Sequence, residues 1–426
     1  MEYSEQECKR FGRYAITSTF FGCLGEQLYA SNSFFILYMV MLGSSESTAM
    51  FSTSLKSWAL LLLMIPAAGL ISRIGTKLAI AVDAFVVCGS FVLMALAPFV
   101  GKYAQPLVLT GIFTYSLVNI LYSGAWYPVL SCFLKPAERG SFFGKMRFYY
   151  MFLNTAFIFV ISCILDKKPP IWVMQLILLL VGLLYLGRKF CIDRMPSLPP
   201  SPHRYDLKKS LSISLRNTPL VGFSFYICFY TLAGSMVIPL SVLYMKTSLN
   251  FSESTIMLVT TAWMAGFICA YAVVGKLMKV MGHKWFQVLN HTITVVSVIG
   301  FCCAAPGMRF LVPLMAVSTF INGLCGAFFT CIFSVEMMAS ARPGNKVMAM
   351  AFCTTFSSLG TAIGRTLLTL ILASGILSDK WMLGTMLMDK YQFLLLGVLV
   401  MLIFFYLLLL LCPSVISKHR DYYRPS

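Results

Sequence analysis

The sequence has little charge and very few acidic residues. Only 11% of its 426 residues are charged, and 15 aspartates and glutamates stand against 33 lysines and arginines. A soluble chain carries about 25% charged residues, so the composition excludes a soluble globular protein. Apolar residues make up 59% of the chain. Apolar runs of about 20 residues, broken by short polar loops, are typical of a polytopic helical membrane protein.

Several motifs of enzymes and nucleotide-binding proteins are also missing. No G-x-x-x-x-G-K-[ST] phosphate loop occurs, which argues against ATP as an energy source, and no H-E-x-x-H or G-x-S-x-G stands at a helix end. The 14 cysteines contain no C-x-x-C pair. The net charge of +18 lies in loops beside the apolar runs, which indicates membrane orientation rather than nucleic-acid binding. We therefore expect no enzyme activity, cofactor, metal site or nucleic-acid partner.

The apolar runs predict an all-α membrane protein with twelve transmembrane helices. Lysines and arginines gather in every second loop and near both termini, which places those segments and both termini in the cytoplasm. The retained first span and this bias predict a multi-pass protein of the cell (plasma or inner) membrane. The expected spans are residues 14–42, 48–71, 78–99, 106–134, 146–165, 171–190, 219–245, 254–277, 285–305, 311–338, 347–375 and 391–412.

The spans fall into two groups of six around one long inner segment. We expect an N-terminal half over residues 1–192, a linker over 193–218, a C-terminal half over 219–413 and a basic tail over 414–426. The linker begins with a Pro/Ser-rich stretch and continues with leucines among lysines. It is expected to hold a short helix on the inner leaflet, and a disordered tether is the alternative.

A ten-residue elbow between the second and third spans occurs twice. The first copy runs from Ala68 to Lys77, and the second runs from Gly275 to Lys284, 207 positions later. The segments 136–139 and 343–346 are separated by the same offset. Two landmarks at one offset indicate an internal duplication of about 200 residues. In each elbow a small residue lets a neighbouring helix approach, and a later glycine, Gly75 or Gly282, is expected to adopt a left-handed turn.

With these elbows the chain resembles the major facilitator superfamily of secondary transporters. The signature of that family is Gly-x-Leu-x-Asp-Arg-x-Gly-Arg-Arg; Leu70, Arg73 and Gly75 match it, whereas Ser72 replaces the Asp. The resemblance implies two pseudo-symmetric six-helix halves that rock about a central cavity. It also implies a cytoplasmic charge lock, for which Asp83 is a candidate acid in place of Ser72. The expected cytoplasmic gate comprises Ala68, Gly69, Arg73, Gly75, Lys77, Asp83, Glu138, Arg139, Gly275, Gly282, Lys284 and Lys346.

Three ionisable residues are expected at membrane depth. Such groups are costly there and normally face one another or a hydrated cavity. Glu26 and Lys56 lie at similar heights, so we expect a state-dependent pair in which Glu26 takes up a proton; a static ion pair is the alternative. Lys56 and Arg365 together predict a positive pocket, unless both side chains reach the outer interface.

Amides and aromatic residues complete the expected substrate pathway. Asn119, Tyr122 and Trp126 share one helix face by their spacing. The pathway set is Glu26, Gln27, Asn32, Lys56, Asn119, Tyr122, Trp126, Tyr226, Tyr230, Asn322 and Arg365. The function predicted is secondary active transport of a small organic solute, anionic or sugar-like, by a monomer coupled to protons or, alternatively, sodium. A membrane sensor or scaffold without transport is the second hypothesis.

Overall fold

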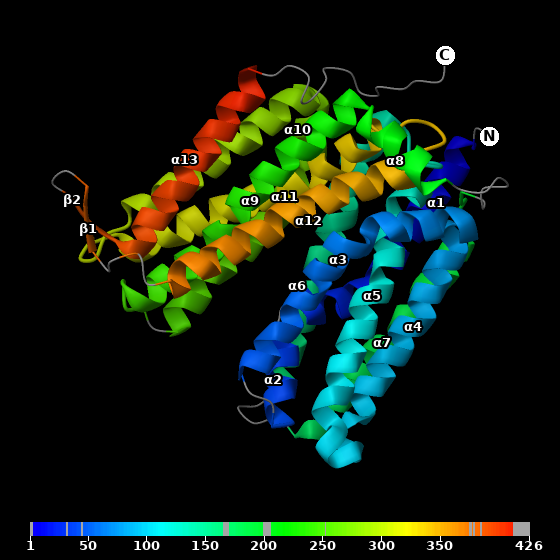
Figure 1. Ribbon diagram of the computed structural model, residues 1–426, viewed down its shortest axis with the longest axis horizontal. Helices are drawn as coiled ribbons and strands as arrows, with labels where there is room; N and C mark the ends of the chain where they lie inside the picture. The colour runs from blue at the N-terminus through cyan, green and yellow to red at the C-terminus, as the bar shows by residue number, and fades with distance from the viewer. Residues whose placement is uncertain are drawn as a thin grey trace. The chain divides into compact units, whose positions relative to one another are not determined.

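The computed structural model describes residues 3–30, 33–43, 46–164, 170–198, 206–251, 253–374, 377, 380–383 and 386–411. Long helices make up almost all of this part of the chain (Figure 1). The helices are α1 (Glu5–Ala30), α2 (Ser33–Met41), α3 (Glu46–Ile74), α4 (Thr76–Leu96), α5 (Ala104–Leu130), α6 (Arg139–Ile164), α7 (Ile171–Asp193), α8 (Leu207–Leu215), α9 (Thr218–Thr247), α10 (Glu253–Cys303), α11 (Leu311–Ala339), α12 (Lys346–Ala373) and α13 (Lys390–Leu411).

Short elements connect some of the long helices. The 3-10 helices are η1 (Ala97–Tyr103) and η2 (Pro136–Glu138). An antiparallel hairpin that the sequence did not predict, β1 (Lys380–Leu383) and β2 (Met386–Asp389), precedes α13, with Lys380 opposite Asp389.

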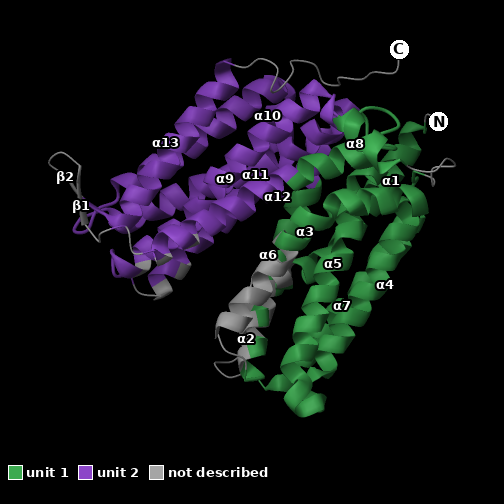
Figure 2. Ribbon diagram, in the orientation of Figure 1, with its two compact units in different colours: residues 1–135, 146–214, 341–355 green, residues 136–145, 215–340, 356–426 purple. Residues whose placement is uncertain are grey.

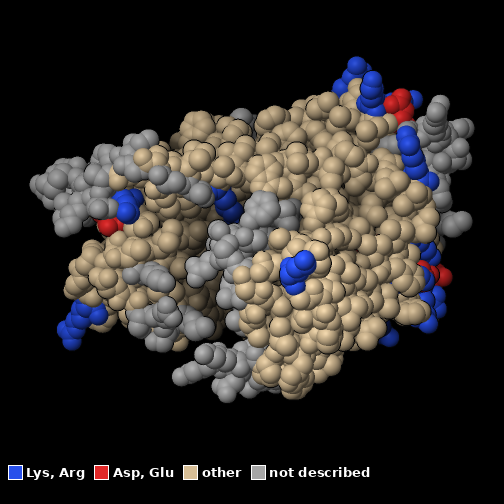
Figure 3. All heavy atoms as spheres, turned by 60° about the horizontal axis from the view of Figure 1, so that its bottom comes forward, with Lys and Arg blue, Asp and Glu red and all other residues tan. Residues whose placement is uncertain are grey.

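The twelve expected spans correspond to these helices. Seven stretches in the described part of the chain are long and apolar enough to cross a membrane, and two of them, Thr76–Leu130 and Leu258–Cys303, each hold two spans. The pair α1 and α2, together with α3 and α6, supplies the others. Figure 3 shows a face on which charged side chains are sparse and gather mostly at one side of the view. Such an apolar surface suits contact with lipid.

Helix α1 begins nine residues before the predicted boundary at residue 14, inside the polar N-terminal segment. The Ser4 hydroxyl accepts a bond from the backbone N–H of Glu7, and the Glu7 carboxylate accepts bonds from the backbone N–H and hydroxyl of Ser4. This reciprocal capping box satisfies N–H groups that a helix start leaves open. The capping box explains why the helix extends beyond its apolar part.

The two elbows share one unusual backbone conformation. Gly75 has φ 87° and ψ 154°, and Gly282 has φ 72° and ψ 167°. The predicted positive φ is therefore confirmed at both positions, but the predicted left-handed turn is wrong because ψ is extended. This region is accessible almost only to glycine. The equal geometry at two positions 207 residues apart supports the internal duplication.

Gly282→Ala is expected to lower the free energy of unfolding by about 1–3 kcal/mol. A Cβ on Gly282 would meet no atom within 4 Å, so the loss would come from the backbone alone. Gly397→Ala in α13 is a matched control, since a Cβ there also meets nothing and φ is not positive. The control should be neutral or more stable by about 0.5–1 kcal/mol. Thermal unfolding in detergent compares the two, and equal stabilities would contradict the strain at Gly282.

The described chain forms two compact units (Figure 2). Unit 1 comprises residues 1–135, 146–214 and 341–355, and unit 2 comprises residues 136–145, 215–340 and 356–426. The short segments 136–145 and 341–355 thus each belong to the unit that holds the other half of the chain. Their starts are separated by about the same offset as the elbows, as expected for duplicated elements.

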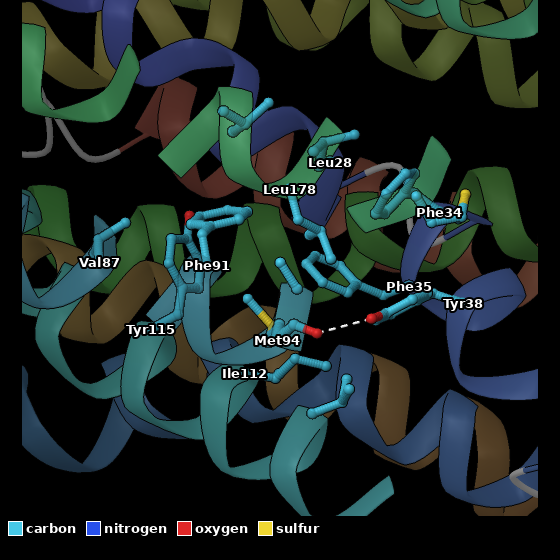
Figure 4. Close-up of a cluster of buried hydrophobic side chains, with 14 of the residues drawn as sticks. Leu28, Phe34, Phe35, Tyr38, Val87, Phe91, Met94, Ile112, Tyr115 and Leu178 are labelled. Carbon is cyan, nitrogen blue, oxygen red and sulfur yellow. Dashed lines mark hydrogen bonds between the residues drawn. The ribbon is translucent and has the colours of Figure 1, made fainter. Parts of the chain in front are cut away.

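The core of unit 1 is an apolar cluster of side chains from α1, α2, α4, α5 and α7 (Figure 4). Phe91 and Tyr115 pack edge to face with ring centroids 5.9 Å apart. The Tyr38 hydroxyl donates to the backbone carbonyl of Met94 at 2.7 Å, which satisfies a polar atom inside the cluster. This core fixes the helices that carry the polar network described next.

Candidate functional site

Arg188 is a fully buried cation on α7 in unit 1. The expected span 171–190 contains Arg188 close to its inner end. Helix α7 continues to Asp193, so Arg188 lies inside the helix and before its last turn. A buried charge is retained only where partners compensate it, and the surroundings of Arg188 supply them.

Glu26 of α1 is the acidic partner of Arg188. The Nη2 atom of Arg188 donates to Oε1 of Glu26 at 2.8 Å, and the two side chains are 0% and 22% exposed. Gly22, one turn earlier on α1, leaves the space that the guanidinium fills, because a Cβ there would overlap it. The ion pair therefore has one hidden member and one member with a partly accessible carboxylate.

Aromatic rings and hydroxyls hold the other sides of the guanidinium. Its central carbon lies 3.6 Å from the ring centroid of Tyr122 and 4.6 Å from that of Tyr185, a cation–π arrangement. The Tyr185 hydroxyl accepts bonds from Nη1 of Arg188 at 2.7 Å and from Nδ2 of Asn119 at 3.0 Å. It donates to Oδ2 of Asp83 at 3.1 Å. Two carboxylates, one guanidinium and one phenol thus form a continuous network.

Asp83 was a candidate acid for the cytoplasmic charge lock, with Arg73, Lys145 or Arg147 as its partner. It is fully buried on α4, whereas Arg73 is exposed. Asp83 is in phase with the buried Ile80, Ala84 and Val87 of the same helix. Its carboxylate faces the interior of unit 1.

The remaining pathway residues of unit 1 are only partly described. Tyr122 and Trp126 stack on α5 with ring centroids 5.5 Å apart, and both are buried. The side chains of Gln27 and Lys56, and residue Asn32, lie outside the described part of the structure. Glu26 was expected to pair with Lys56, whose side chain is not described; the cation that contacts Glu26 in the described chain is Arg188.

A second polar network lies in unit 2 and carries no acid. The Tyr226 hydroxyl bonds Nδ1 of His291 at 2.9 Å and accepts a bond from Nε2 of Gln287 at 2.7 Å. The Tyr230 hydroxyl bonds Thr294 at 2.9 Å and accepts from Nδ2 of Asn290 at 3.2 Å. Tyr226 and Tyr230, both predicted pathway residues, are therefore buried among hydrogen-bond partners.

The two networks occupy related positions in the duplicated chain. Asn290 lies at the 207-residue offset from Asp83, and each of the two side chains bonds a tyrosine hydroxyl. The acid in unit 1 corresponds to a neutral amide in unit 2. Both units thus have a buried polar site at related positions, with carboxylates in only one of them.

Two other predicted pathway residues lie in unit 2. Asn322 on α11 is half-buried, and Arg365 on α12 is exposed. Between them in chain order, Phe329 and Phe333 of α11 continue a row of stacked rings, with Phe329 4.8 Å from Tyr230. The Phe329 and Phe333 side chains are half-buried, so this row gives unit 2 a partly accessible aromatic wall.

The first elbow holds the start of the linker through backbone carbonyls. Lys77 Nζ donates to the carbonyl of Asp193 at 3.0 Å, and the Thr76 hydroxyl donates to the carbonyl of Leu198 at 3.3 Å. Ser72 lines a cavity of about 350 Å³ together with Thr76 and the residues from Pro343 to Met348. Lys346, a predicted gate residue, also lines this cavity. Ala68 and Gly69 are buried on α3.

The second elbow contains a close contact between a histidine and a buried glutamate. His283 follows Gly282, and its Nδ1 lies 2.5 Å from Oε1 of the buried Glu336 on α11. Glu336 is 53 positions further along the chain, so no local pattern indicated the contact.

The other gate residues of unit 2 lie around the start of α6. A Cβ on Gly275 would meet Ser141 Cα at 2.7 Å, so the predicted close approach at this glycine is present. Arg139 begins α6 and is buried, whereas Glu138 is exposed. Lys284 is half-buried on α10.

The site chemistry is that of charge and hydrogen bonding. Among the residues that the structure describes, no group of three or more His, Cys, Asp or Glu side chains could hold a metal ion. The strongest feature is the buried Glu26–Arg188 pair with its tyrosine and aspartate neighbours. Such groups in a membrane protein mark substrate or ion pathways.

Comparisons with known proteins agree with this architecture. Residues 223–421 match the family model of the Major Facilitator Superfamily. No curated protein sequence matches the chain. Solved structures that share the fold include a bacterial homologue of the iron transporter ferroportin in an outward-facing state, at 11% identity and TM-score 0.73, covering 94% of this chain and 98% of that one.

Two further neighbours have similar scores. A proton:xylose symporter shows 12% identity, TM-score 0.71 and coverage of 98% of both chains. The human organic anion transporter MFSD10 shows 12% identity and TM-score 0.70, covering 94% of this chain and 99% of that one. At such identities the likeness concerns the fold. The family model covers residues 223–421, and the shared fold extends over 94–98% of the chain, so this protein is similar to the multi-pass membrane transporters of the Major Facilitator Superfamily.

Proposed function

We propose that this protein is a secondary active transporter that moves a small organic solute by alternating access, driven by protons. The observation that carries the proposal is the ion pair between the partly accessible Glu26 and the fully buried Arg188. A charge pair at membrane depth is expensive to maintain. A carboxylate that alternately pairs with a cation and binds a proton would explain why a protein keeps such a pair.

Protonation of Glu26 would change the balance of the network. The ionised carboxylate holds Nη2 of Arg188 at 2.8 Å, and the neutral acid would hold it far less strongly. The ion pair thus favours one conformation of α1 against α7, and the proton favours release. A ligand shifts a conformational equilibrium only if it binds the two conformations with different affinity. The proton meets this condition, because it binds Glu26 more tightly when the carboxylate is not paired with Arg188.

The solute class is inferred from the structural neighbours, and the membrane location from the charges of the loops. The structural neighbours include proteins named for the transport of xylose and of organic anions, so sugars and organic anions are the first solutes to test. The basic loops support a cell-membrane protein with both termini cytoplasmic. We propose a monomer, with sodium as the alternative coupling ion.

Counterflow in proteoliposomes tests the transport function. Solutes that raise the melting temperature of the purified protein are selected first, and then the exchange of labelled for unlabelled solute is measured. Saturable exchange supports a transporter. A protein that binds a solute but never exchanges it would instead be a sensor built on the same fold.

Glu26→Gln is expected to abolish uptake driven by a pH gradient while counterflow continues. Gln keeps a hydrogen-bond acceptor for Arg188 but cannot take up a proton. Glu5→Gln is the control, because Glu5 is exposed at the start of α1 and forms a surface pair with Lys9. Gradient-driven accumulation that is equal in the two variants would show that Glu26 does not couple protons.

A further inference from the structure

A groove of about 380 Å³ lies in unit 1 between α1 and α6. Its lining is mostly apolar or aromatic and includes Ile16, Thr17 and Phe20 of α1 and Met146, Tyr149 and Leu153 of α6. The groove is open, because the Phe20 and Tyr149 side chains on its two walls are 39% and 45% exposed. An open apolar surface on a membrane-spanning unit is suited to contact with hydrocarbon chains.

The threonines of α1 do not make the groove polar. Thr17 Oγ1 donates to the backbone carbonyl of Arg13 at 3.0 Å, and Thr19 Oγ1 donates to that of Ala15 at 3.0 Å. Each hydroxyl is thus satisfied within its own helix, which leaves the threonine methyl groups for contact. Because threonine is small, it also leaves space that a larger side chain would fill. The lining therefore fits a hydrocarbon chain better than a polar solute.

Arg13 stands at the end of the groove that is nearest the N-terminus. It precedes Ile16 and Thr17 by three and four residues, so it lies on the same face of α1, one helical turn earlier. Arg13 is exposed and forms no ion pair with an acid in the described part of the chain. A charge-assisted bond from a guanidinium to a phosphate is among the stronger polar contacts. A cation beside an apolar groove is complementary to a molecule with an anionic head and a hydrocarbon chain.

We propose that this groove binds an anionic phospholipid from the leaflet on the side of the N-terminus. One acyl chain lies between α1 and α6, and the phosphate is bound by Arg13. The Tyr149 ring, exposed at the edge of the groove, has the combination of apolar body and hydroxyl that suits the interface between chains and head groups. The bound lipid holds α1 against α6.

The lipid site is separate from the polar network inside unit 1. Nine residues, or two and a half helical turns, separate Arg13 from Gly22 on α1. Gly22 faces the guanidinium of Arg188, as does Glu26 one turn later. The groove and the ion pair therefore lie on opposite sides of α1. Lipid binding requires that the chain spans a membrane, but it does not depend on which solute is transported or whether any is.

Native mass spectrometry of the full-length protein in detergent tests the role of the charge. Phosphatidylglycerol, which is anionic, and phosphatidylcholine, which is zwitterionic, are added with identical acyl chains. The wild type should retain phosphatidylglycerol about fivefold better, as expected for one basic residue near an anionic head group. Arg13→Gln should lose this preference and retain phosphatidylcholine as before. Arg194→Gln is the control, since Arg194 is exposed just after α7, and it should keep the preference. Equal retention of both lipids by the wild type, or a preference that survives in Arg13→Gln, would overturn the proposal.

Filling the groove tests the place of the acyl chain. Thr17→Phe should reduce the retention of both lipids by about fivefold or more, because the ring occupies the space of the chain. Thr17→Ala removes the same hydroxyl but leaves the groove open, so it should bind both lipids as the wild type does. Thr110→Phe is the matched control, since Thr110 on α5 is exposed and also donates to the carbonyl four residues earlier. Undiminished retention in Thr17→Phe would contradict a chain in this groove.

Excess inorganic phosphate distinguishes a phospholipid from a free anion. It should leave phosphatidylglycerol bound, because the acyl chain supplies most of the contact. Displacement by phosphate would show a site for the head group alone and would overturn the proposal. Arg13 and Thr17 are both exposed, so their variants should fold. None of these measurements needs a solute, so a wild type without counterflow would contradict the proposed function and not the lipid site.

Discussion

Arg188→Gln is expected to lower the free energy of unfolding by about 3–5 kcal/mol at neutral pH, the usual loss when one member of a buried pair is removed. Glu26 would lose the cation 2.8 Å from its carboxylate, and Tyr122 would lose the guanidinium 3.6 Å from its ring centroid. Urea unfolding of the purified protein measures the loss. Gradient-driven uptake should disappear in the same variant.

The pH dependence of this variant distinguishes a charge effect from a packing effect. Without Arg188 the Glu26 carboxylate has lost the cation that lay 2.8 Å away, and protonation of the carboxylate relieves this loss, so the variant should regain stability as the pH falls. The sign follows from linkage, because the folded variant binds protons that stabilise it. Arg194→Gln is the matched control, since Arg194 is exposed just after the end of α7. Its loss should stay within about 0.5 kcal/mol; a loss equal to that of Arg188→Gln would contradict the buried charge network.

The burial of Arg188 could have been predicted from the sequence. Arg188 lies in phase with Val181, Tyr185 and Ile192, all buried on one stripe of α7, whereas Lys189 falls outside that stripe. Arg188 and Lys189 lie equally close to the end of the helix, so a count of cations near helix ends assigns both of them to the cytoplasmic membrane surface. Their position around the helix axis separates them, so the signal was present in the periodicity and absent from the charge count.

The elbows illustrate the opposite case. Glycine at positions 75 and 282, at one offset, predicted a special backbone conformation, and both residues have positive φ. The value of ψ could not be predicted, because it depends on how the next helix packs and not on the glycine itself. The twelve spans were predictable for a similar reason, since long apolar runs must be helical in lipid.

Contacts between distant segments were the part that the sequence could not provide. His283 contacts Glu336, and Asn345 donates to the carbonyl of Ser210 and the hydroxyl of Ser214. Each contact joins residues that are dozens of positions apart and depends on helix rotation. A single sequence carries composition and spacing but no record of which faces meet.

Gly360 and Gly364 of α12 are expected to be difficult to replace by any larger residue. A Cβ on Gly360 would overlap the carbonyl oxygen of Cys228, and a Cβ on Gly364 would overlap that of Leu232. Both obstacles are backbone atoms of α9, which cannot turn aside as a side chain can. A glycine pair four residues apart is the usual means by which membrane helices approach closely.

Replacing both glycines by alanine should lower the free energy of unfolding by about 1–3 kcal/mol for each site, as in other overpacked cores. The two helices would have to separate, which would also break the 3.1 Å bond from the Thr231 hydroxyl to the carbonyl of Ser357. Gly234→Ala is the matched control on α9, because a Cβ there meets no atom within 4 Å. That change should be neutral or stabilising by about 0.5–1 kcal/mol. If all three alanine substitutions gave equal stabilities, α9 and α12 would not cross at these glycines, because only a backbone contact makes Gly360 and Gly364 differ from Gly234.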